Sequence, residues 1–266
     1  MEIREIERAD VPELIELWVE VFGDRRSYAE SFFAALPDVG SGVAALCSGK
    51  IVGAAYTLNG QELVENGRTT ALGYLYGVGV YEEYRGRGIG GELIKAVYAL
   101  SGKRGASIVC ILPAEESLYD WYEELLGMKH LLRRKRVLCK ADAAEQVMPL
   151  SVTEYALWRE NYLRNKPHVR LSSFSLALEE RLCAEYGGGF FMSESGIAAA
   201  YMDEDAVIVR EVLSADDAAS LRVAASVGAA LGAKDCLVCL PSESGYNYIL
   251  SDRPLPADCV WNLSFD

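Results

Sequence analysis

The sequence predicts an α/β protein in which a mixed central sheet is flanked by helices, followed by a second, smaller α/β domain. Three observations support this prediction. Strand-like and helix-like apolar patterns alternate along the chain. The glycine-rich stretch YEEYRGRGIGG, residues 81–91, separates a strand-like run from a helix-like run. Residues 141–149, ADAAEQVMP, have the composition of a linker, so we expect domains at residues 1–140 and 150–266.

The first domain is expected to follow the order β-α-α-β-β-β-α-β-α-β. Asp10 is predicted to cap a helix over residues 11–22, which ends at Gly23. Asn59-Gly60 and Asn66-Gly67 are predicted hairpin turns. The other expected elements are a strand at 2–8, a helix at 26–35 closed by Pro37, hairpin strands at 42–48 and 51–58, a strand at 69–80, a helix from residue 89, a strand at 106–113, a helix at 117–127 and a strand at 128–140.

The second domain is expected to repeat this architecture in an altered form. The stretch IVCILPAEES (108–117) resembles LVCLPSES (237–244), and each follows a helix that itself follows a long apolar strand. The shorter spacing in the second copy falls where the first copy has its glycine loop. The expected elements are helices at 152–164, 174–186 and 215–231, and strands at 187–193, 196–203, 206–214, 236–241 and 259–265.

Composition and charge limit the function classes. The chain of 266 residues is 51% apolar and 24% charged, as in ordinary globular proteins, and it has no apolar run long enough to span a bilayer. Its first residues lack the apolar core of a signal peptide, so we expect a cytoplasmic protein without a membrane partner. The net charge of −13 argues against nucleic-acid binding. Residues 1–140 contribute −3 and residues 141–266 contribute −10, which would suit a cationic partner or simply favour solubility.

Cysteine and histidine usage predicts no metal site. The seven cysteines lie mostly in apolar runs and are expected to be buried, reduced thiols. Cys236 and Cys239 form a C-x-x-C, but residues three apart in a strand point to opposite faces. With only two histidines in the chain, a histidine-based metal site or a Ser-His-Asp triad is poorly supported.

The glycine loop is suited to a pyrophosphate. A helix N-terminus has unpaired N–H groups and a dipole that favours anions, and glycines let an anion approach the backbone. Arg85 and Arg87 add positive charge. The corresponding helix of the second half begins with Ser214-Ala-Asp-Asp217, a capping box whose carboxylates would repel phosphate.

Three phosphate-loop motifs compete for this stretch. A Walker loop fails, because Gly91 is followed by Glu92 rather than by Lys. The dinucleotide fingerprint G-x-G-x-x-G matches at Gly86, Gly88 and Gly91, but YEEYR intervenes after the strand and hairpin strands come first. The third motif, Arg-x-x-Gly-x-Gly, matches at Arg85, Gly88 and Gly90.

With its downstream segment IVCILPAEESLYDWYEELLGM, this stretch resembles the Gcn5-related N-acetyltransferase (GNAT) family, over about residues 1–138. The resemblance implies a GNAT fold with a splayed central sheet, and a second, degenerate GNAT-like domain without a pyrophosphate loop. It implies acetyl-CoA as cosubstrate, with the pantetheine arm along the free edge of the strand at Val78, Gly79 and Val80. The pyrophosphate would lie on the backbone of the loop, for which the binding residues are Arg85, Gly86, Arg87, Gly88, Ile89, Gly90 and Gly91.

The resemblance also implies a tyrosine that protonates the leaving thiolate. Tyr122 is the matching residue, although one extra residue separates it from Gly127 and Met128 replaces the usual aromatic. Tyr119, one helical turn earlier, is a rival, and both could instead pack on the sheet. The family's common asparagine before this helix is absent, with Glu115 or Glu116 nearby.

The general base is not predicted. Glu115, Glu116 and Glu62 are candidates, as is Asp266 by analogy with relatives that use a terminal carboxylate. The favoured function is an acetyl-CoA-dependent N-acetyltransferase that acts by direct attack of a primary amine, of a small molecule or peptide, in a ternary complex. The alternatives are a non-catalytic acyl-CoA-binding or regulatory protein and, less favoured, a nicotinamide or flavin oxidoreductase.

Overall fold

The computed structural model describes residues 1–263, which form two compact units. The first unit consists of residues 1–62, 69–131 and 249–254, and the second takes the rest of the described chain. The main chain therefore leaves the first unit at Leu131, earlier than the boundary predicted at residue 140. A short segment near the end of the chain also returns to the first unit.

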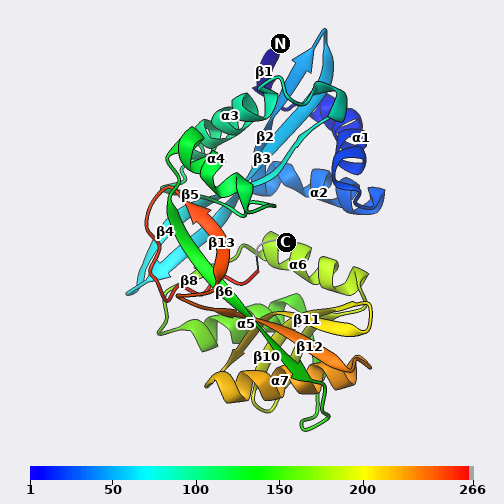
Figure 1. The fold of residues 1–266 in the computed structure, drawn as a ribbon, viewed down its shortest axis with the longest axis vertical. Helices are drawn as coiled ribbons and strands as arrows, with labels where there is room; N and C mark the ends of the chain where they lie inside the picture. Colours follow the sequence, from blue (N-terminus) through cyan, green and yellow to red (C-terminus); the bar gives the residue numbers. More distant parts are fainter. Residues whose placement is uncertain (264–266) are drawn as a thin grey trace. The chain divides into compact units, whose positions relative to one another are not determined.

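The first unit contains four helices and most of the strands predicted for it (Figure 1). Its elements are β1 (Glu2–Glu5), α1 (Val11–Phe22), α2 (Arg26–Val39), β2 (Gly40–Cys47), β3 (Lys50–Glu65), β4 (Arg68–Val80), α3 (Ile89–Lys103), β5 (Ile108–Ile111) and α4 (Ser117–Leu126). Helices α1 and α4 end at Gly23 and Gly127, both in the left-handed conformation that glycine adopts without strain. These two helix ends confirm the prediction.

The first-unit sheet has the order β1-β2-β3-β4-β5-β13. Strand β13 (Tyr246–Ser251) pairs antiparallel with β5. Asp252 fastens this segment: its carboxylate accepts hydrogen bonds from Val109 N (2.9 Å) and from the Tyr98 hydroxyl (2.8 Å). The first unit is thus completed by residues that lie far along the chain, which the sequence did not predict.

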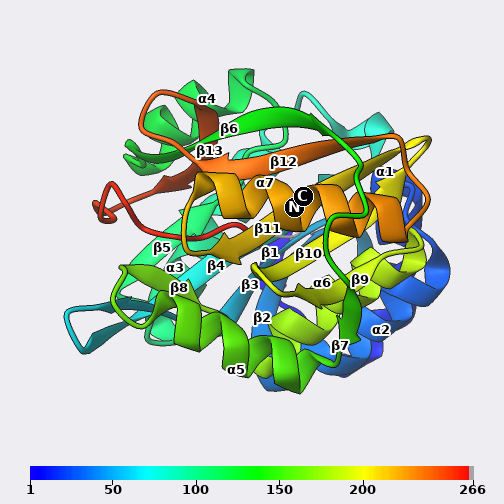
Figure 2. The ribbon, with the colours of Figure 1, turned by 90° about the horizontal axis from the view of Figure 1, so that it is seen from below.

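The second unit repeats much of this order, with an added strand, β8, between its first two helices and no counterpart of α4 among the described residues. Its elements are β6 (His130–Lys140), β7 (Met148–Leu150), α5 (Val152–Leu163), β8 (His168–Arg170), α6 (Ser173–Glu185), β9 (Gly189–Ser193), β10 (Gly196–Asp203), β11 (Ala206–Ser214), α7 (Asp217–Ala230) and β12 (Asp235–Pro241). The strand order β7-β9-β10-β11-β12-β6 has one parallel pair, β11–β12, as the first unit has β4–β5. Figure 2 shows α7 lying along this part of the sheet.

The repeat extends to the helices and the cores. Helices α1 and α5 both have twelve residues. In the first unit, α3 and α4 pack against one face of the sheet. The buried apolar cluster between them includes Leu93, Val97 and Leu75. In the second unit, α7 packs Val223 and Val227 against β10, β11 and β12 in the same way. The two units thus share a sheet order and a helix packed beside one parallel strand pair, which agrees with the architectural repeat predicted from the sequence.

Four local predictions are wrong. Asp10 is the N-cap residue of α1, as predicted, but its side chain does not form the cap: its carboxylate pairs with Arg4 at 2.7 Å and accepts a hydrogen bond from Glu7 N. Asn59-Gly60 is not a hairpin turn, because β3 runs through it and Gly60 supplies a positive φ of 81° within the strand. Helix α2 continues past Pro37 to Val39.

The fourth concerns the strand expected at 259–265. In the part that the structure describes, this segment forms an isolated bridge from Val260 to His168 and no strand. Within residues 1–263, no helix is both long and apolar enough to cross a membrane. In the same range, no group of three or more His, Cys, Asp or Glu side chains is placed to hold a metal ion.

Candidate functional site

The strand β4 leaves its parallel neighbour β5 partway along its length. The two strands pair from Leu72 with Ile108 to Leu75 with Ile111, where β5 ends. Strand β4 continues to Val80, so its last residues extend beyond the paired region. A parallel strand without its neighbour presents backbone N–H and C=O groups at a free edge. The extension of β4 beyond the end of β5 is compatible with the predicted splay between these strands.

A bulge-like shift at Gly77 turns the side chains of this free segment. Gly77 has a φ of 61°, and a Cβ at this position would lie 2.9 Å from a ring carbon of Trp18 on α1. Leu75 and Val78 both join the cluster under α3 and α4, whereas the intervening Tyr76 packs against Trp18. Two consecutive residues, Tyr76 and Gly77, therefore face α1 and α2, as expected for a β-bulge.

The predicted edge residues Val78, Gly79 and Val80 lie in this segment. Val78 and Val80 are half-buried with their side chains toward α3, and Gly79 is buried. A Cβ on Gly79 would lie 3.0 Å from ring and methyl carbons of α1, so glycine permits the close approach of the helix.

The loop from Tyr81 to Gly88 connects this strand to α3. Gly86 and Gly88 have φ values of 73° and 77°, and Gly88 is the N-cap of α3. A Cβ on Gly86, Gly88 or Gly90 would meet no heavy atom within 4 Å, so these glycines border open space. The first helical hydrogen bond joins Glu92 N to Gly88 O. The N–H groups of Ile89, Gly90 and Gly91 thus precede the helical ladder.

The remaining loop residues have mainly structural contacts. Ile89 is buried in the core, so only its backbone is available to a ligand, and Gly91 packs near Trp121. Arg85 Nε donates to Val80 O at 3.0 Å, and Arg87 donates to Glu83 O at 2.8 Å. Both arginines are exposed, so their charges are available at the loop. Their hydrogen bonds to backbone carbonyls also stabilise the loop conformation.

Helix α4 presents Tyr122 and Tyr119 to the α3 face of the sheet. Both are buried members of the same core cluster. Burial raises the pKa of the Tyr122 hydroxyl well above its usual value, so this group holds its proton at neutral pH. Within residues 1–263, no hydrogen bond is made by the Tyr122 hydroxyl, and the ring of Tyr122 packs against Trp121 with centroids 4.8 Å apart. Tyr119 also has an interaction partner.

The carboxylates considered as general bases lie on different elements and have different contacts. Glu115 and Glu116 lie at the start of α4, where Glu115 accepts a long hydrogen bond from Ser117 (3.5 Å). Glu62 is half-buried on β3 and has an interaction partner. Asp266 lies outside the described residues. No carboxylate among the described residues is therefore singled out by geometry.

The equivalent position of the second unit differs in its loop. Only Ala215 and Asp216 connect β11 to α7, compared with residues 81–88 in the first unit. Asp216 is the N-cap, and its carboxylate accepts a hydrogen bond from Ala219 N at 2.8 Å. The predicted cap, Ser214, instead donates to Asp216 O. Since the helix N-terminus carries its own carboxylate, it does not provide a phosphate site.

The second unit also fills its bulge with charged side chains. Strands β11 and β12 pair only as far as Val209 with Val238, and the register with β10 skips Arg210. Arg210 and Glu211 consequently point to the same face. Arg210 pairs with Glu179 of α6 at 3.2 Å, and both of these side chains are nearly inaccessible to solvent.

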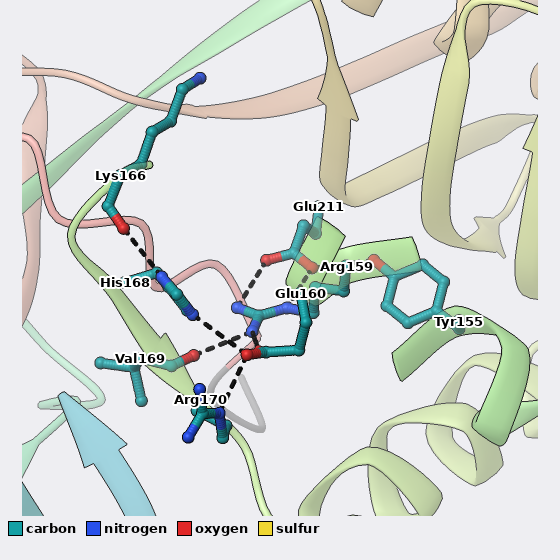
Figure 3. Close-up of polar contacts among 8 residues, drawn as sticks. All are labelled: Tyr155, Arg159, Glu160, Lys166, His168, Val169, Arg170 and Glu211. Carbon is teal, nitrogen blue, oxygen red and sulfur yellow. Dashed lines mark hydrogen bonds and ion pairs between the residues drawn. The ribbon is translucent and has the colours of Figure 1, made fainter. Parts of the chain in front are cut away.

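Figure 3 shows the network around Glu211. Arg159 Nε and the Tyr155 hydroxyl each donate to Glu211 Oε2 at 2.8 Å. Arg159 also donates to Val169 O at 2.9 Å. This network was not predicted from the sequence, although the adjacent Arg and Glu within the apolar run AVIVREVLS were an available signal, since a buried strand tolerates charges only in pairs.

A second carboxylate, Glu160, lies at the edge of this network (Figure 3). It accepts a hydrogen bond from Arg170 Nε at 2.9 Å and lies 3.4 Å from His168 Nε2. Burial alone would raise the pKa of Glu160, but the bonds from His168 and Arg170 outweigh it and lower the pKa from 4.5 to about 2. These contacts hold the short strand β8 against α5.

Comparisons with known proteins agree with this architecture. Residues 2–123 match the family model described as an acetyltransferase (GNAT) domain. No curated protein matches the sequence. Several solved structures share the fold across both units. A conserved protein of unknown function from Enterococcus faecalis V583 has a TM-score of 0.73 at 12% identity, covering 94% of this chain and 72% of that one.

Two further structures carry the family name. A GCN5-related N-acetyltransferase from Kribbella flavida has a TM-score of 0.68 at 18% identity, covering 94% of this chain and 70% of that one. A GCN5-related N-acetyltransferase from Sphaerobacter thermophilus has a TM-score of 0.56 at 13% identity and covers 94% of each chain. At these identities the likeness concerns the fold alone. Residues 2–123 thus match the model of the GNAT acetyltransferase domain, and the chain shares the fold of solved GNAT structures.

Proposed function

We propose that the protein is an acetyl-CoA-dependent N-acetyltransferase that transfers an acetyl group to a primary amine. The observation that supports this most directly is the free edge of β4. The strand separates from β5 after Leu75 and leads directly into the glycine loop at the start of α3. A pantetheine arm is an extended, amide-containing chain, and a free strand edge offers it hydrogen bonds as an added strand would.

The residues present fit acetyl-CoA. The open space beside Gly86, Gly88 and Gly90 would admit a pyrophosphate, which unpaired N–H groups and the helix dipole favour. The residues that would hold the cosubstrate are the strand edge Val78, Gly79 and Val80 and the loop residues Arg85, Gly86, Arg87, Gly88, Ile89, Gly90 and Gly91. Arg85 would also position the end of β4, because its Nε donates a hydrogen bond to the carbonyl oxygen of Val80.

The chemistry requires one proton to be supplied and one to be removed. The bound thioester supplies the acetyl group: the C–S bond breaks as the N–C bond forms, the amine loses a proton and the sulfur gains one. Tyr122 is our proposed acid, because its hydroxyl stays protonated and has no other partner in residues 1–263. Tyr119, one helical turn earlier in the same core cluster, is the alternative acid. The proton of the amine would pass to water.

The second unit is proposed to be a degenerate GNAT-like domain. Its strand order, twelve-residue first helix and bulge repeat those of the first unit, while its shorter connection and capped helix leave no pyrophosphate loop. Its acidic composition is compatible with a cationic amine acceptor. The acceptor class we propose is a small molecule or a peptide with a primary amine.

A thiol-release assay over a panel of primary amines tests the proposal. We expect acetyl-CoA to raise the unfolding temperature and at least one amine to release CoA, with loss of release in Gly88→Glu and Tyr122→Phe. Stabilisation by acetyl-CoA without release would favour a non-catalytic acyl-CoA-binding protein. Stabilisation by NAD(H) and not by CoA would favour an oxidoreductase and contradict the proposal.

A further inference from the structure

We propose that a cavity in the second unit binds a small organic ammonium ion that carries an apolar group. The cavity has a volume of about 440 Å³, which is within the range of small-molecule sites. All of its described lining belongs to the second unit, and none of these residues takes part in the proposed acetyl transfer. The side chains that define its chemistry are Met148, Trp158, Tyr162, Met192 and Glu194.

Helix α5 supplies the aromatic wall of this cavity. Trp158 and Tyr162 are four residues apart and therefore lie on one face of the helix, with ring centroids 6.4 Å apart. The helix is held against the sheet because Tyr155 stacks on Phe190 of β9 with centroids 4.0 Å apart. Trp158 is 42% exposed, so a large part of its side chain is available to a ligand. The two rings are thus carried by a fixed element.

The edge of the sheet supplies a second wall, made of two methionines. Met148 of β7 lies directly opposite Met192 of β9 in the antiparallel register, so the two side chains are on the same face. Phe190, two residues before Met192, is on this face too, and its stack with Tyr155 shows that the face is turned toward α5. Thioether side chains are flexible and polarizable, and they adapt to apolar groups of varied shape.

Glu194 gives the cavity a negative charge. It lies in the turn between β9 and β10, and within residues 1–263 its carboxylate makes no hydrogen bond or ion pair. Glu145 differs, because its carboxylate accepts a hydrogen bond from Ser195 N at 3.0 Å and pairs with Arg222 at 3.7 Å. Glu145 thus holds the turn and has a counter-ion of its own. No lysine or arginine is among the described residues that line the cavity.

These features together select the class of ligand. A cation over the face of an aromatic ring is attracted by the ring quadrupole, and tryptophan gives the strongest attraction. The carboxylate of Glu194 would attract the same cation and repel an anion. The methionine wall favours a molecule that also buries apolar surface over a hydrated inorganic ion. A small amine that is charged at one end and apolar at the other meets all three conditions.

Calorimetric titration of the full chain with benzyltrimethylammonium tests this inference. We expect saturable binding of this cation and no comparable binding of phenylmethanesulfonate, which has the same benzyl group and the opposite charge. Trp158→Leu keeps an apolar side chain but removes the aromatic face, and should raise Kd about 3- to 30-fold. Glu194→Gln keeps the size of the side chain and removes its charge. Because this carboxylate is exposed, we expect Kd to rise only about 2- to 5-fold.

Leu157→Ala and Glu204→Gln are the matched controls, and both should bind the cation as the wild type does. Leu157 is next to Trp158 and is 69% exposed, and Glu204 is an exposed carboxylate in the turn between β10 and β11. Neither is among the described residues that line the cavity. Since Glu194 lies in an exposed turn, its variant keeps the test valid even if Trp158→Leu does not fold.

Three results would overturn the inference. The first is a folded wild type without saturable binding up to about 10 mM cation, or with equal binding of the sulfonate. The second is an unchanged Kd in both Trp158→Leu and Glu194→Gln. The third is self-association of the wild type, measured by sedimentation, that Trp158→Leu abolishes, because the cavity would then receive a second copy of the chain. The titration contains no acetyl-CoA and the quaternary cation has no N–H to acetylate, so its outcome is independent of the thiol-release assay.

Discussion

Arg159 donates its Nε–H to the carboxylate of Glu211 at 2.8 Å, and the two side chains are 1% and 0% exposed. Arg159 is the eighth residue of α5, as Trp18 is the eighth residue of α1. Trp18 in turn packs where a side chain on Gly77 would lie. An aromatic ring over a glycine in one unit is therefore replaced by an ion pair in the other.

The ion pair should make a large contribution to the stability of the second unit. In Glu211→Gln, Arg159 would remain buried without a counter-charge, and breaking such a pair costs about 3–5 kcal/mol. Calorimetric unfolding should show this loss in the transition of the second unit. Replacing both partners by apolar residues, Arg159→Met with Glu211→Leu, should be less destabilising than Glu211→Gln alone. A single substitution that changes stability by under about 1 kcal/mol would contradict this view.

The stability of the second unit should fall in acid because of Glu160. Its pKa is about 2 in the folded protein, compared with 4.5 for an unperturbed glutamate. A depressed pKa adds stability above the unfolded pKa, and this stability is lost as pH falls from about 4.5 toward 2. The unfolding midpoint measured against pH should lose part of its acid dependence in Glu160→Gln. Glu243→Gln, at an exposed carboxylate of the same unit, should behave as the wild type.

A methyl group on Gly88 should weaken acetyl-CoA binding. The alanine Cβ would stand in the open space that we assign to the pyrophosphate, and the left-handed φ of 77° would be strained. We expect Kd for acetyl-CoA, measured by calorimetry, to rise at least about tenfold. Gly105→Ala is the control, because Gly105 also has a positive φ and no heavy atom near its Cβ position, but lies beyond the other end of α3. Equal effects of the two substitutions on Kd would count against the loop assignment.

Removing the hydroxyl of Tyr122 should slow turnover. General acid catalysis contributes on the order of 100-fold or more, so Tyr122→Phe should lower kcat by about that factor with a small change in the KM for acetyl-CoA. Tyr119→Phe, one turn earlier on the same helix, should retain most of the activity. Since burial raises the pKa of Tyr122, its hydroxyl should stay protonated, and kcat of the wild type should not fall through its deprotonation, up to about pH 10, the ordinary pKa of a tyrosine. A larger loss in Tyr119→Phe would reverse the assignment.

Local patterns in the sequence predicted the parts of the fold that local interactions determine. Helices α1, α3 and α4 and the glycine loop follow from apolar periodicity and from glycines with positive φ. The prediction for Asn59-Gly60 is wrong for a physical reason: a turn and a distorted strand both require a positive φ, so the dipeptide does not distinguish them. The free edge of β4 was predictable only through the family resemblance.

Long-range pairings could not be predicted. Strand β13 has a short apolar core in YNYILS, and nothing local indicates that its partner is β5, about 140 residues earlier. The role of Trp18 depends on a glycine nearly 60 residues away, and the positions of Arg210 and Glu211 depend on a register skip. The sequence gives the identity of these residues, but their contacts depend on how distant strands pair in the folded sheet.

The place of residues 249–254 in the first unit has a consequence for how the protein is made. Synthesis proceeds from the N-terminus, so α1 to α4 emerge from the ribosome long before the strand that covers the edge of β5. During that interval Val109 lacks the bonds it makes with Asp252, and an open strand edge can pair with other chains. The first unit, although it is translated first, thus completes its sheet only after most of the second unit has been made.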